Sequence, residues 1–291
     1  MLIPTLAAPL ARLVPAALQD RIGRETASLV GSLLVRPGHP LICTDPAGVA
    51  ALDKMRDRLL AALPVEATEA AGAAPGSDSI RVQVVGSGLV NAFAAPGGHI
   101  VLTHGIIRYA DGPEAVAGVL AHEIGHVVAG DGMVRVMRTT MTGVIVALLT
   151  GDASGGFGAA GLGQFIEAGY SQDQERAADL FAVRLLTASR LPVAPFIGLF
   201  EKIGQEVGEA PDWLGWIATH PDPAARVAEL RGYDTGLTGP ALLTAQEWQA
   251  LRGICGPAAD SIPLRLRLTG DGNGRGNGNG NGNGNGNGNG E

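Results

Sequence analysis

Residues His122 to His126 read His-Glu-Ile-Gly-His, two histidines flanking a glutamate at the spacing that zinc hydrolases use. At roughly 100° per residue on a helix, His122 and His126 lie about 40° apart, so both imidazoles can reach one ion. Zinc held in this way lowers the pKa of a water molecule to about 7, and Glu123 would take its proton as a general base. The segment therefore predicts metal-assisted hydrolysis, with about one zinc ion per chain.

The segment around these residues is apolar on nearly every side. It starts at Pro113 and Glu114, and Ala, Val, Leu and Ile dominate as far as Ala129. A helix that is apolar all round is buried, and burying two imidazoles and a carboxylate without partners costs several kcal/mol. In a structural alternative, backbone carbonyls satisfy the histidines and a cation satisfies the glutamate. Placement at i and i+4 on a buried helix favours the metal.

A catalytic zinc site takes three protein ligands and leaves a further position for water. The extended pattern that supplies a third histidine fails here, because Ala129 and Gly132 stand where it requires Gly and His. The third ligand must therefore come from elsewhere in the chain, and the best candidate is Glu175.

Glu175 lies near the start of a second predicted helix, residues 171–188. Asp179 follows it by one turn on the same face, where it would accept the free ring N–H of a ligating histidine and fix its tautomer. In the alternative, both carboxylates are solvated charges that pair with Arg176 or Arg184. The upstream histidine pair favours the ligand interpretation.

Four separated segments occur in a fixed order: Asn91–Gly98, His122–His126, Glu175–Asp179, and Thr219–Pro221 with Arg226. Together they resemble the zinc endopeptidase family that includes the CAAX prenyl protease and HtpX, and within it the soluble or peripheral branch of BepA-like periplasmic proteases. The resemblance covers about residues 80 to 232. It implies an α+β, mainly helical fold: a gluzincin-type zinc protease core with a small β-sheet and an active-site helix pair.

The resemblance also assigns roles to single residues. His122, His126 and Glu175 would hold zinc, and Glu123 would be the catalytic base. Asp179 falls in the same segment as the third ligand, which agrees with its expected role behind a histidine.

His220 lies just before a predicted helix that carries Arg226. By the resemblance, His220 would lie near the zinc, where it would either polarise the scissile carbonyl or occupy the open metal position and hold the enzyme inactive. Arg226 would orient that loop or stabilise the oxyanion. The alternative for a lone loop histidine is exposure to solvent. The remaining histidines, His39, His99 and His104, are assigned no metal role.

A small sheet is predicted before the zinc helix. Residues 80–85 are rich in β-branched side chains, and residues 89–94, Pro-Gly-Gly and residues 99–103 read as a hairpin. By the resemblance, an edge strand beside the metal pairs with an extended peptide substrate. That edge would be made by Asn91, Ala92, Phe93 and Ala94. The alternative is a sheet that only covers the helices.

The elements that position these groups are mostly helices. Residues 13–34 and 46–63 are predicted to form N-terminal helices. Capping boxes at Ser171–Gln174 and Thr244–Glu247 indicate where two later helices begin. The small side chain of Ala178 allows its helix to approach a neighbour closely.

The chain is expected to divide into three parts. Residues 1–75 would be a helical segment that packs on the metalloprotease domain, residues 76–269. The Gly-Asn repeat of residues 270–291 cannot bury a core, so we expect it to be disordered. The apolar run 139–151 is too short to span a membrane and suggests a soluble or peripheral helix pair, and the glycines of 151–163 suggest, alternatively, a mobile lid.

The net charge of the chain limits the classes of molecule that it is expected to bind. The formal net charge of −7 argues against nucleic acid. We expect polypeptide substrates and, at most, a peripheral contact with a membrane; the sequence sets no oligomeric state.

Two cysteines, Cys43 and Cys255, lie near opposite ends of the expected folded region. A disulfide between them would tie the N-terminal helices to the C-terminal helix and would require an oxidising compartment. The alternative is a pair of buried free thiols. The N-terminus lacks the basic start of a secretory signal. Because the resembled branch is periplasmic, we expect the bacterial cell envelope, with the cytoplasm as the alternative.

The leading functional hypothesis is a zinc endopeptidase that acts on unfolded or misassembled proteins. Its rival is a chaperone-like protein whose metal site is blocked by His220 and which holds clients on the edge strand. The intact Glu123 favours the enzyme, because a purely binding protein needs no base beside the metal. A membrane-associated protease of prenylated or lipid-embedded substrates is disfavoured by the missing membrane spans.

Overall fold

In this computed structural model of the protein, the described residues are 3–35, 37–63, 80–150, 169–206, 220 and 222–256. The Gly-rich stretch 151–163, with its expected lid, and the Gly-Asn repeat 270–291, with its expected disorder, lie outside the described residues.

The described elements follow one another along the chain as α1 (Ile3–Ala11), α2 (Ala16–Leu34), α3 (Pro46–Leu60), β1 (Arg81–Val85), β2 (Ala92–Ala95), the 3-10 turn η2 (Pro96–Gly98), β3 (His99–Thr103), α5 (His104–Tyr109), α6 (Pro113–Ala129), α7 (Asp131–Thr150), α9 (Gln172–Ala188), α10 (Ala194–Glu206), α12 (Pro223–Arg231) and α13 (Ala245–Arg252). The expected α+β, mainly helical architecture with a small sheet and an active-site helix pair is confirmed.

The sheet has the order β1-β3-β2, with β1 parallel and β2 antiparallel to the central β3. The predicted hairpin between β2 and β3 is confirmed, and β2 is an edge strand of this sheet. The strand begins at Ala92 rather than at residue 89. The Thr103 N–H still donates to the Asn91 carbonyl, but the Asn91 N–H donates to the Thr103 hydroxyl, so the regular backbone pairing ends there.

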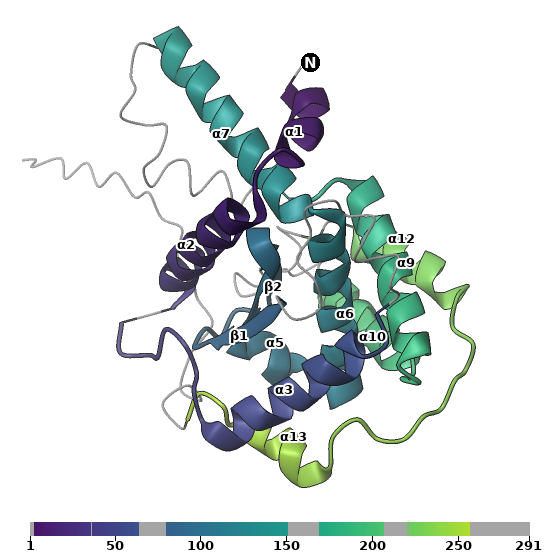
Figure 1. The fold of residues 1–291 in the computed structure, drawn as a ribbon. Coiled ribbons are helices and arrows are strands. Elements are labelled where there is room, and N and C mark those ends of the chain that lie inside the picture. The colour runs from purple at the N-terminus through teal and green to yellow at the C-terminus, as the bar shows by residue number, and fades with distance from the viewer. Residues whose placement is uncertain are drawn as a thin grey trace, which may run out of the picture.

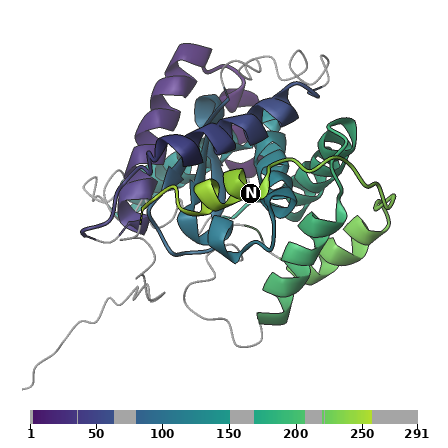
Figure 2. The same ribbon diagram turned by 90° about the horizontal axis from the view of Figure 1, so that it is seen from below.

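Alternate residues of the sheet pack into two different apolar clusters, as the two-residue period of a strand requires. Val101 and Phe93 pack with α2 on one face. Ile100 and Leu102 face the main core, which they share with α6 and α3. Helix α6, which carries His122, Glu123 and His126, therefore lies inside the molecule, between the sheet and the helices α9 and α10. Figures 1 and 2 show α9, α10 and α12 grouped on the opposite side of the molecule from α2.

Helices α1 and α7 pack together and extend beyond the rest of the fold (Figure 1). Residues 139–150 of the apolar run lie in the longer helix α7, Asp131–Thr150. In the part of the chain that the structure describes, no helix is long and apolar enough to cross a membrane. The sequence missed α1, which contains Pro9, and placed the start of α2 three residues too early because Pro15 precedes its first turn.

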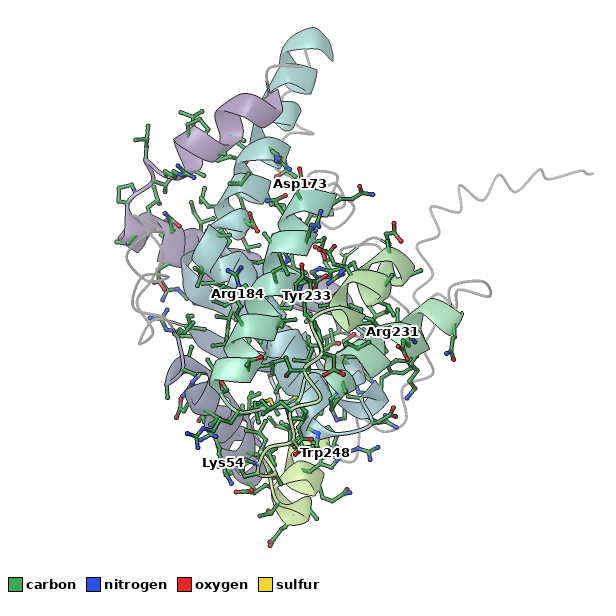
Figure 3. All side chains as sticks on the ribbon, turned by 90° about the vertical axis from the view of Figure 1, so that its right-hand side faces the viewer. Lys54, Asp173, Arg184, Arg231, Tyr233 and Trp248 are labelled. Carbon is green, nitrogen blue, oxygen red and sulfur yellow. A yellow bond between two sulfur atoms is a disulfide. The ribbon has the colours of Figure 1, made fainter. Side chains whose placement is uncertain are left out.

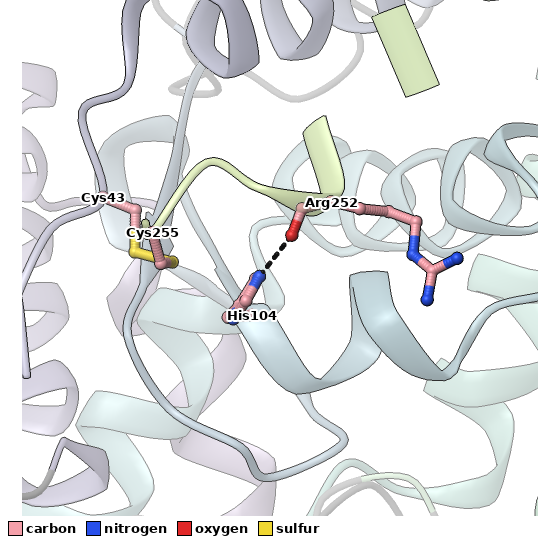
Figure 4. Close-up of a disulfide and its surroundings, with 4 residues drawn as sticks. All are labelled: Cys43, His104, Arg252 and Cys255. Carbon is pink, nitrogen blue, oxygen red and sulfur yellow. Dashed lines mark hydrogen bonds between the residues drawn. A yellow bond between two sulfur atoms is a disulfide. The ribbon is translucent and has the colours of Figure 1, made fainter. Parts of the chain in front are cut away.

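The two cysteines form a disulfide that joins the segment before α3 to the segment after α13. Beside it, the imidazole of His104 contacts the carbonyl of Arg252 at 2.7 Å (Figure 4). Lys54, in the middle of α3, pairs with Glu247 in the first turn of α13, and Figure 3 shows Lys54 and Trp248 at the same end of the molecule. The disulfide and the ion pair thus connect α3 to α13 at two points. Helix α3 ends at Leu60, three residues before its predicted end.

Candidate metal centre

Helix α6 presents the His-Glu-x-x-His residues from inside the core. It begins with Pro113, whose missing N–H costs nothing at a first helical position, and ends where Gly130 adopts a left-handed φ of 72°. The side chains of His122, Glu123 and His126 are fully buried. Because no apolar environment tolerates three such groups without partners, the rest of the fold must supply them.

Helix α9 supplies a carboxylate by packing closely against α6. A Cβ added to Gly125 would lie 3.1 Å from the Cα of Ala178, so the two backbones meet where both residues are small. The predicted capping box at the start of α9 is confirmed, with Gln174 reaching back to Ser171. This approach brings Glu175, only 1% exposed, to the two histidines of α6.

The alternative in which the α9 carboxylates are solvated charges is wrong. Glu175 and Asp179 are both buried, whereas Arg176 pairs with Glu229 on the surface. Arg184 is exposed, and Figure 3 shows it on the outer face of α9. The candidate partners therefore lie on the face of the helix that points away from the site.

Four side chains converge at one point: His122, His126, Glu175 and His220 each offer an atom, and all four atoms lie within 4.8 Å of one another. The Nε2 atoms of the two α6 histidines are 3.1 Å apart, and Glu175 oxygens lie 3.5 Å from the first and 3.4 Å from the second. Nitrogen and oxygen ligands around a tetrahedral zinc ion are separated by about 3.3 to 3.4 Å. The spacing of the donors thus fits a small tetrahedral metal ion.

The structure places His220 inside this cluster, so the alternative of a solvent-exposed loop histidine is wrong. Its Nδ1 lies 2.9 Å from a Glu175 oxygen and 3.3 Å from Nε2 of His122. Its Nε2 lies 3.4 Å from Glu123 Oε1 and 3.4 Å from the backbone oxygen of Ala92. One imidazole therefore touches a metal donor, the predicted base and the edge strand at once.

Behind His122 lies a buried ion-pair network. Its Nδ1 is 3.0 Å from Asp179 Oδ1, the arrangement in which a carboxylate accepts the ring N–H and fixes the tautomer. Arg226 donates two hydrogen bonds of 2.7 Å to Asp179, from Nε and Nη2, and its Nη1 is 2.8 Å from Glu175. The guanidinium also covers the ring of Phe200 at 4.3 Å. Arg226 thus joins α12 to α9 behind the donors.

Three residues of the site were not found from the sequence. Asp131 Oδ2 lies 2.8 Å from Nδ1 of His126, and Gln174 donates to the other oxygen of Asp131. Tyr170 stacks on His126 with ring centroids 3.8 Å apart. The sequence does contain a signal for Asp131, which is an acid five residues beyond His126 and directly after a helix-ending glycine. Nothing in the sequence indicated Tyr170.

The predicted edge strand, Asn91 to Ala94, lies beside the cluster with all its side chains buried. Three of its outward-facing backbone groups already have partners. The Tyr170 hydroxyl donates to the Ala94 carbonyl at 3.2 Å, the Ala92 N–H donates to the Asn91 side chain at 2.8 Å, and His220 lies at the Ala92 carbonyl. The place where an extended peptide would pair is therefore occupied by side chains in this conformation.

The cluster strongly perturbs proton affinities. Burial lowers the pKa of His126, but the carboxylates of Asp131 and Glu175 outweigh this and raise it to about 9. Burial raises the pKa of Glu175, yet the surrounding histidines hold it well below its usual range. Burial also lowers the pKa of His220, which favours a neutral imidazole. A metal that binds His126 at neutral pH must therefore displace a proton.

Glu123 differs from the other buried acids of the site. Neither of its carboxylate oxygens accepts a hydrogen bond from the described residues. Buried polar groups are normally hydrogen-bonded, so a buried carboxylate with unfilled acceptor positions indicates a functional role. It lies beside the converging donors, where a general base would be required.

A family model described as peptidase family M48 matches residues 58–234. The beta-barrel assembly-enhancing protease of Yersinia pestis is 30% identical over 163 residues, which are 51% of this chain and 33% of that protein. Its namesake in Escherichia coli K12 is 29% identical over 154 residues, 49% of this chain and 32% of that protein. The mitochondrial metalloendopeptidase OMA1 of Schizosaccharomyces pombe is 28% identical over 142 residues, 48% and 42% of the two chains. The chain spans about a third of the length of the two bacterial relatives.

Proposed function

The chain belongs to peptidase family M48, and from that premise we propose that it is a zinc-dependent endopeptidase that hydrolyses peptide bonds of unfolded or misassembled proteins. The observation that carries the proposal is the convergence of buried metal donors beside Glu123, a buried carboxylate whose oxygens accept no hydrogen bond within the described part of the chain. The names of the relatives, a protease and a metalloendopeptidase, support the same class of reaction.

Zinc is the metal that this donor set suits best. Two imidazoles and a carboxylate, from His122, His126 and Glu175, make the ligand set of a known class of catalytic zinc sites, and their spacing fits a tetrahedral ion. Asp179 and Asp131 stand behind the histidines at 3.0 and 2.8 Å, as carboxylates that orient zinc-binding imidazoles do. When bound, zinc supplies the Lewis acidity that polarises the scissile carbonyl and makes water acidic near neutral pH.

The chain's own residues would then move the protons and hold the substrate. The Glu123 carboxylate accepts the proton of the attacking water and returns it to the leaving amine. The outward-facing backbone groups of β2 at Ala92 and Ala94 pair with an extended peptide once Tyr170 and His220 have left them. Arg226 is committed to Asp179 and Glu175, which supports a role in orienting the site rather than in stabilising an oxyanion.

His220 is proposed to block the site in this conformation. Its Nδ1 is the fourth donor of the cluster, where a catalytic site keeps a position open, and its Nε2 lies at Glu123. The imidazole thus excludes water from the metal position and from the base at the same time.

We expect the His220→Ala variant to cleave casein several-fold faster than the wild-type protein at equal zinc content. Removing the imidazole opens the fourth position and leaves Glu123 in place. Initial rates with labelled casein, measured beside zinc content, provide the comparison. A His39→Ala variant serves as the control. A fall in rate with zinc retained would instead assign His220 to the transition state.

The alternative function is chaperone-like binding of client proteins on the β2 edge with a mostly inactive site. The occupied fourth position favours this alternative, because a permanently bound His220 would leave the metal without catalytic access. Metal bound by wild type, Glu123→Gln and His220→Ala, with casein cleaved by none of them under any condition, would favour the binding protein.

A bacterial envelope location is proposed from the disulfide between Cys43 and Cys255, which favours an oxidising compartment. The bacterial relatives carry a name that refers to β-barrel assembly, which agrees with this location. We expect protein purified from its native compartment to gain the mass of two alkyl groups only after reduction. Two thiols that alkylate without reduction in the unfolded protein would remove the physical basis for this location.

A further inference from the structure

The side chain of Gln174 is bonded at both ends. Its Oε1 accepts a hydrogen bond of 3.0 Å from the backbone N–H of Ser171, which closes the capping box at the start of α9. Its Nε2 donates to Oδ1 of Asp131, the first residue of α7. One amide therefore connects the beginnings of two helices that lie 43 residues apart in the chain.

Asp131 continues the connection into the metal cluster. Its second oxygen, Oδ2, lies 2.8 Å from Nδ1 of His126, and both side chains are buried. The opposite nitrogen of the same ring, Nε2, is the atom that faces Glu175 at 3.4 Å. The contact of Nδ1 with Asp131 thus orients the His126 ring so that its Nε2 points toward Glu175 and the other donors of the cluster.

The connection joins two donors that come from different helices. Glu175 directly follows Gln174, so the amide that caps α9 also sets the position of the turn that carries Glu175. His126 stands at the end of α6, and Gly130 at φ 72° leads the chain to Asp131. Because His126 and Glu175 lie on different helices, the distance between them depends on how α6 and α9 pack, and the hydrogen bond between Gln174 and Asp131 adds a further contact near their ends.

We propose that Gln174 and Asp131 are positioning residues that hold His126 and Glu175 in register for the metal, an inference that rests on the proposed zinc site. Both hydrogen bonds run through buried or half-buried groups, where such contacts are stronger than in water and costly to leave unmade.

Position 174 requires a side chain that accepts and donates at once. Glutamate there would close the capping box equally well, because that box needs only an acceptor for the Ser171 N–H. It would donate nothing to Asp131 and would set two carboxylates against each other at short range. The Gln174→Glu substitution therefore removes the connection and keeps the helix cap.

The test measures zinc affinity by competition with a chromophoric chelator, and the visible spectrum of the cobalt-substituted protein, in wild type, Gln174→Glu, Asp131→Asn and the double variant. We expect Gln174→Glu to weaken zinc binding by about 10- to 100-fold and to alter the cobalt spectrum. In the double variant the amide introduced at position 131 donates to the carboxylate introduced at position 174, while its oxygen still accepts from His126. Affinity should therefore return to within a few-fold of wild type, a non-additive result.

Gln172→Glu is the matched control, because it adds the same charge to the same exposed helix start without contacting Asp131. Far-UV circular dichroism of the metal-free variants verifies that each one folds. The proposal is overturned if Gln174→Glu binds zinc as tightly as Gln172→Glu, or if the double variant is as weak as the sum of the single changes. Zinc binding and casein cleavage by the wild-type protein test the proposed function separately. If the wild type binds zinc and cleaves casein but the variants give either of these overturning results, only the positioning role is rejected. If the wild type binds no zinc, both the positioning role and the proposed function are rejected.

Discussion

The Glu123→Gln variant is expected to lose casein cleavage by about 10²- to 10⁴-fold while it retains its zinc, because the amide cannot accept the proton of the attacking water. The substitution keeps the size of the side chain. It also removes a buried negative charge whose oxygens accept no hydrogen bond from the described residues, so the folded protein should not lose stability. Single-turnover cleavage rates and zinc content, determined on the same preparation, give both quantities.

A Glu201→Gln variant controls for the loss of one carboxylate elsewhere, because Glu201 only pairs with Arg231 on the surface. Its rate should equal that of the wild type. Retention of more than about a tenth of the wild-type rate by Glu123→Gln would remove Glu123 from the role of general base, since general base catalysis contributes at least about 10²-fold.

The second large effect is expected from Glu175→Gln, which should weaken zinc binding by more than about 100-fold. Substitution of a residue that only contacts a metal ligand weakens metal binding by at most roughly 100-fold, and Glu175 is proposed to be a ligand itself. Glu175 contacts both α6 histidines, His220 and Arg226, so its charge also balances the buried guanidinium. Breaking such a buried pair costs about 3 to 5 kcal/mol, which should appear as a lower free energy of unfolding of the metal-free variant in urea.

The pH dependence of this stabilisation follows from the lowered pKa of the Glu175 carboxyl. A depressed folded-state pKa contributes stability above the unfolded pKa and loses it as pH falls, so the difference between wild type and Glu175→Gln should persist at neutral pH and shrink on acidification. The Asp173→Asn variant is the control, because Asp173 is exposed on the same helix (Figure 3). Unchanged zinc affinity in Glu175→Gln would show that the third ligand is another residue.

Local patterns were sufficient for the two helices that build the site. Helix α6 has its predicted start and end, and the capping box of Ser171 and Gln174 begins α9 where expected. The reason is that helix periodicity, caps and the i, i+4 spacing of His122 and His126 depend only on neighbours along the chain. The hairpin of β2 and β3 was predictable on the same basis, whereas the short α1 was hidden by its prolines.

The two cysteines illustrate what the sequence can predict about a disulfide and what requires the tertiary structure. With only two in the chain, Cys43 and Cys255 admit a single intramolecular pairing, yet the sequence left free thiols as an alternative. Their Cα atoms lie 4.5 Å apart only because α3 and α13 pack together. The division of the chain at residues 75 and 269 stays a prediction.

The sequence by itself determined the buried histidine pair, the glutamate between them and the best candidate for a third metal donor, because each of these is encoded in a short stretch of one helix. Only the tertiary structure decided that His220 completes the cluster, that Tyr170 covers the β2 edge, and that Asp131 and Gln174 connect His126 to the helix of Glu175. These contacts join residues from separate elements. Their distances are set by how closely α6, α7 and α9 pack, a quantity that no single segment encodes.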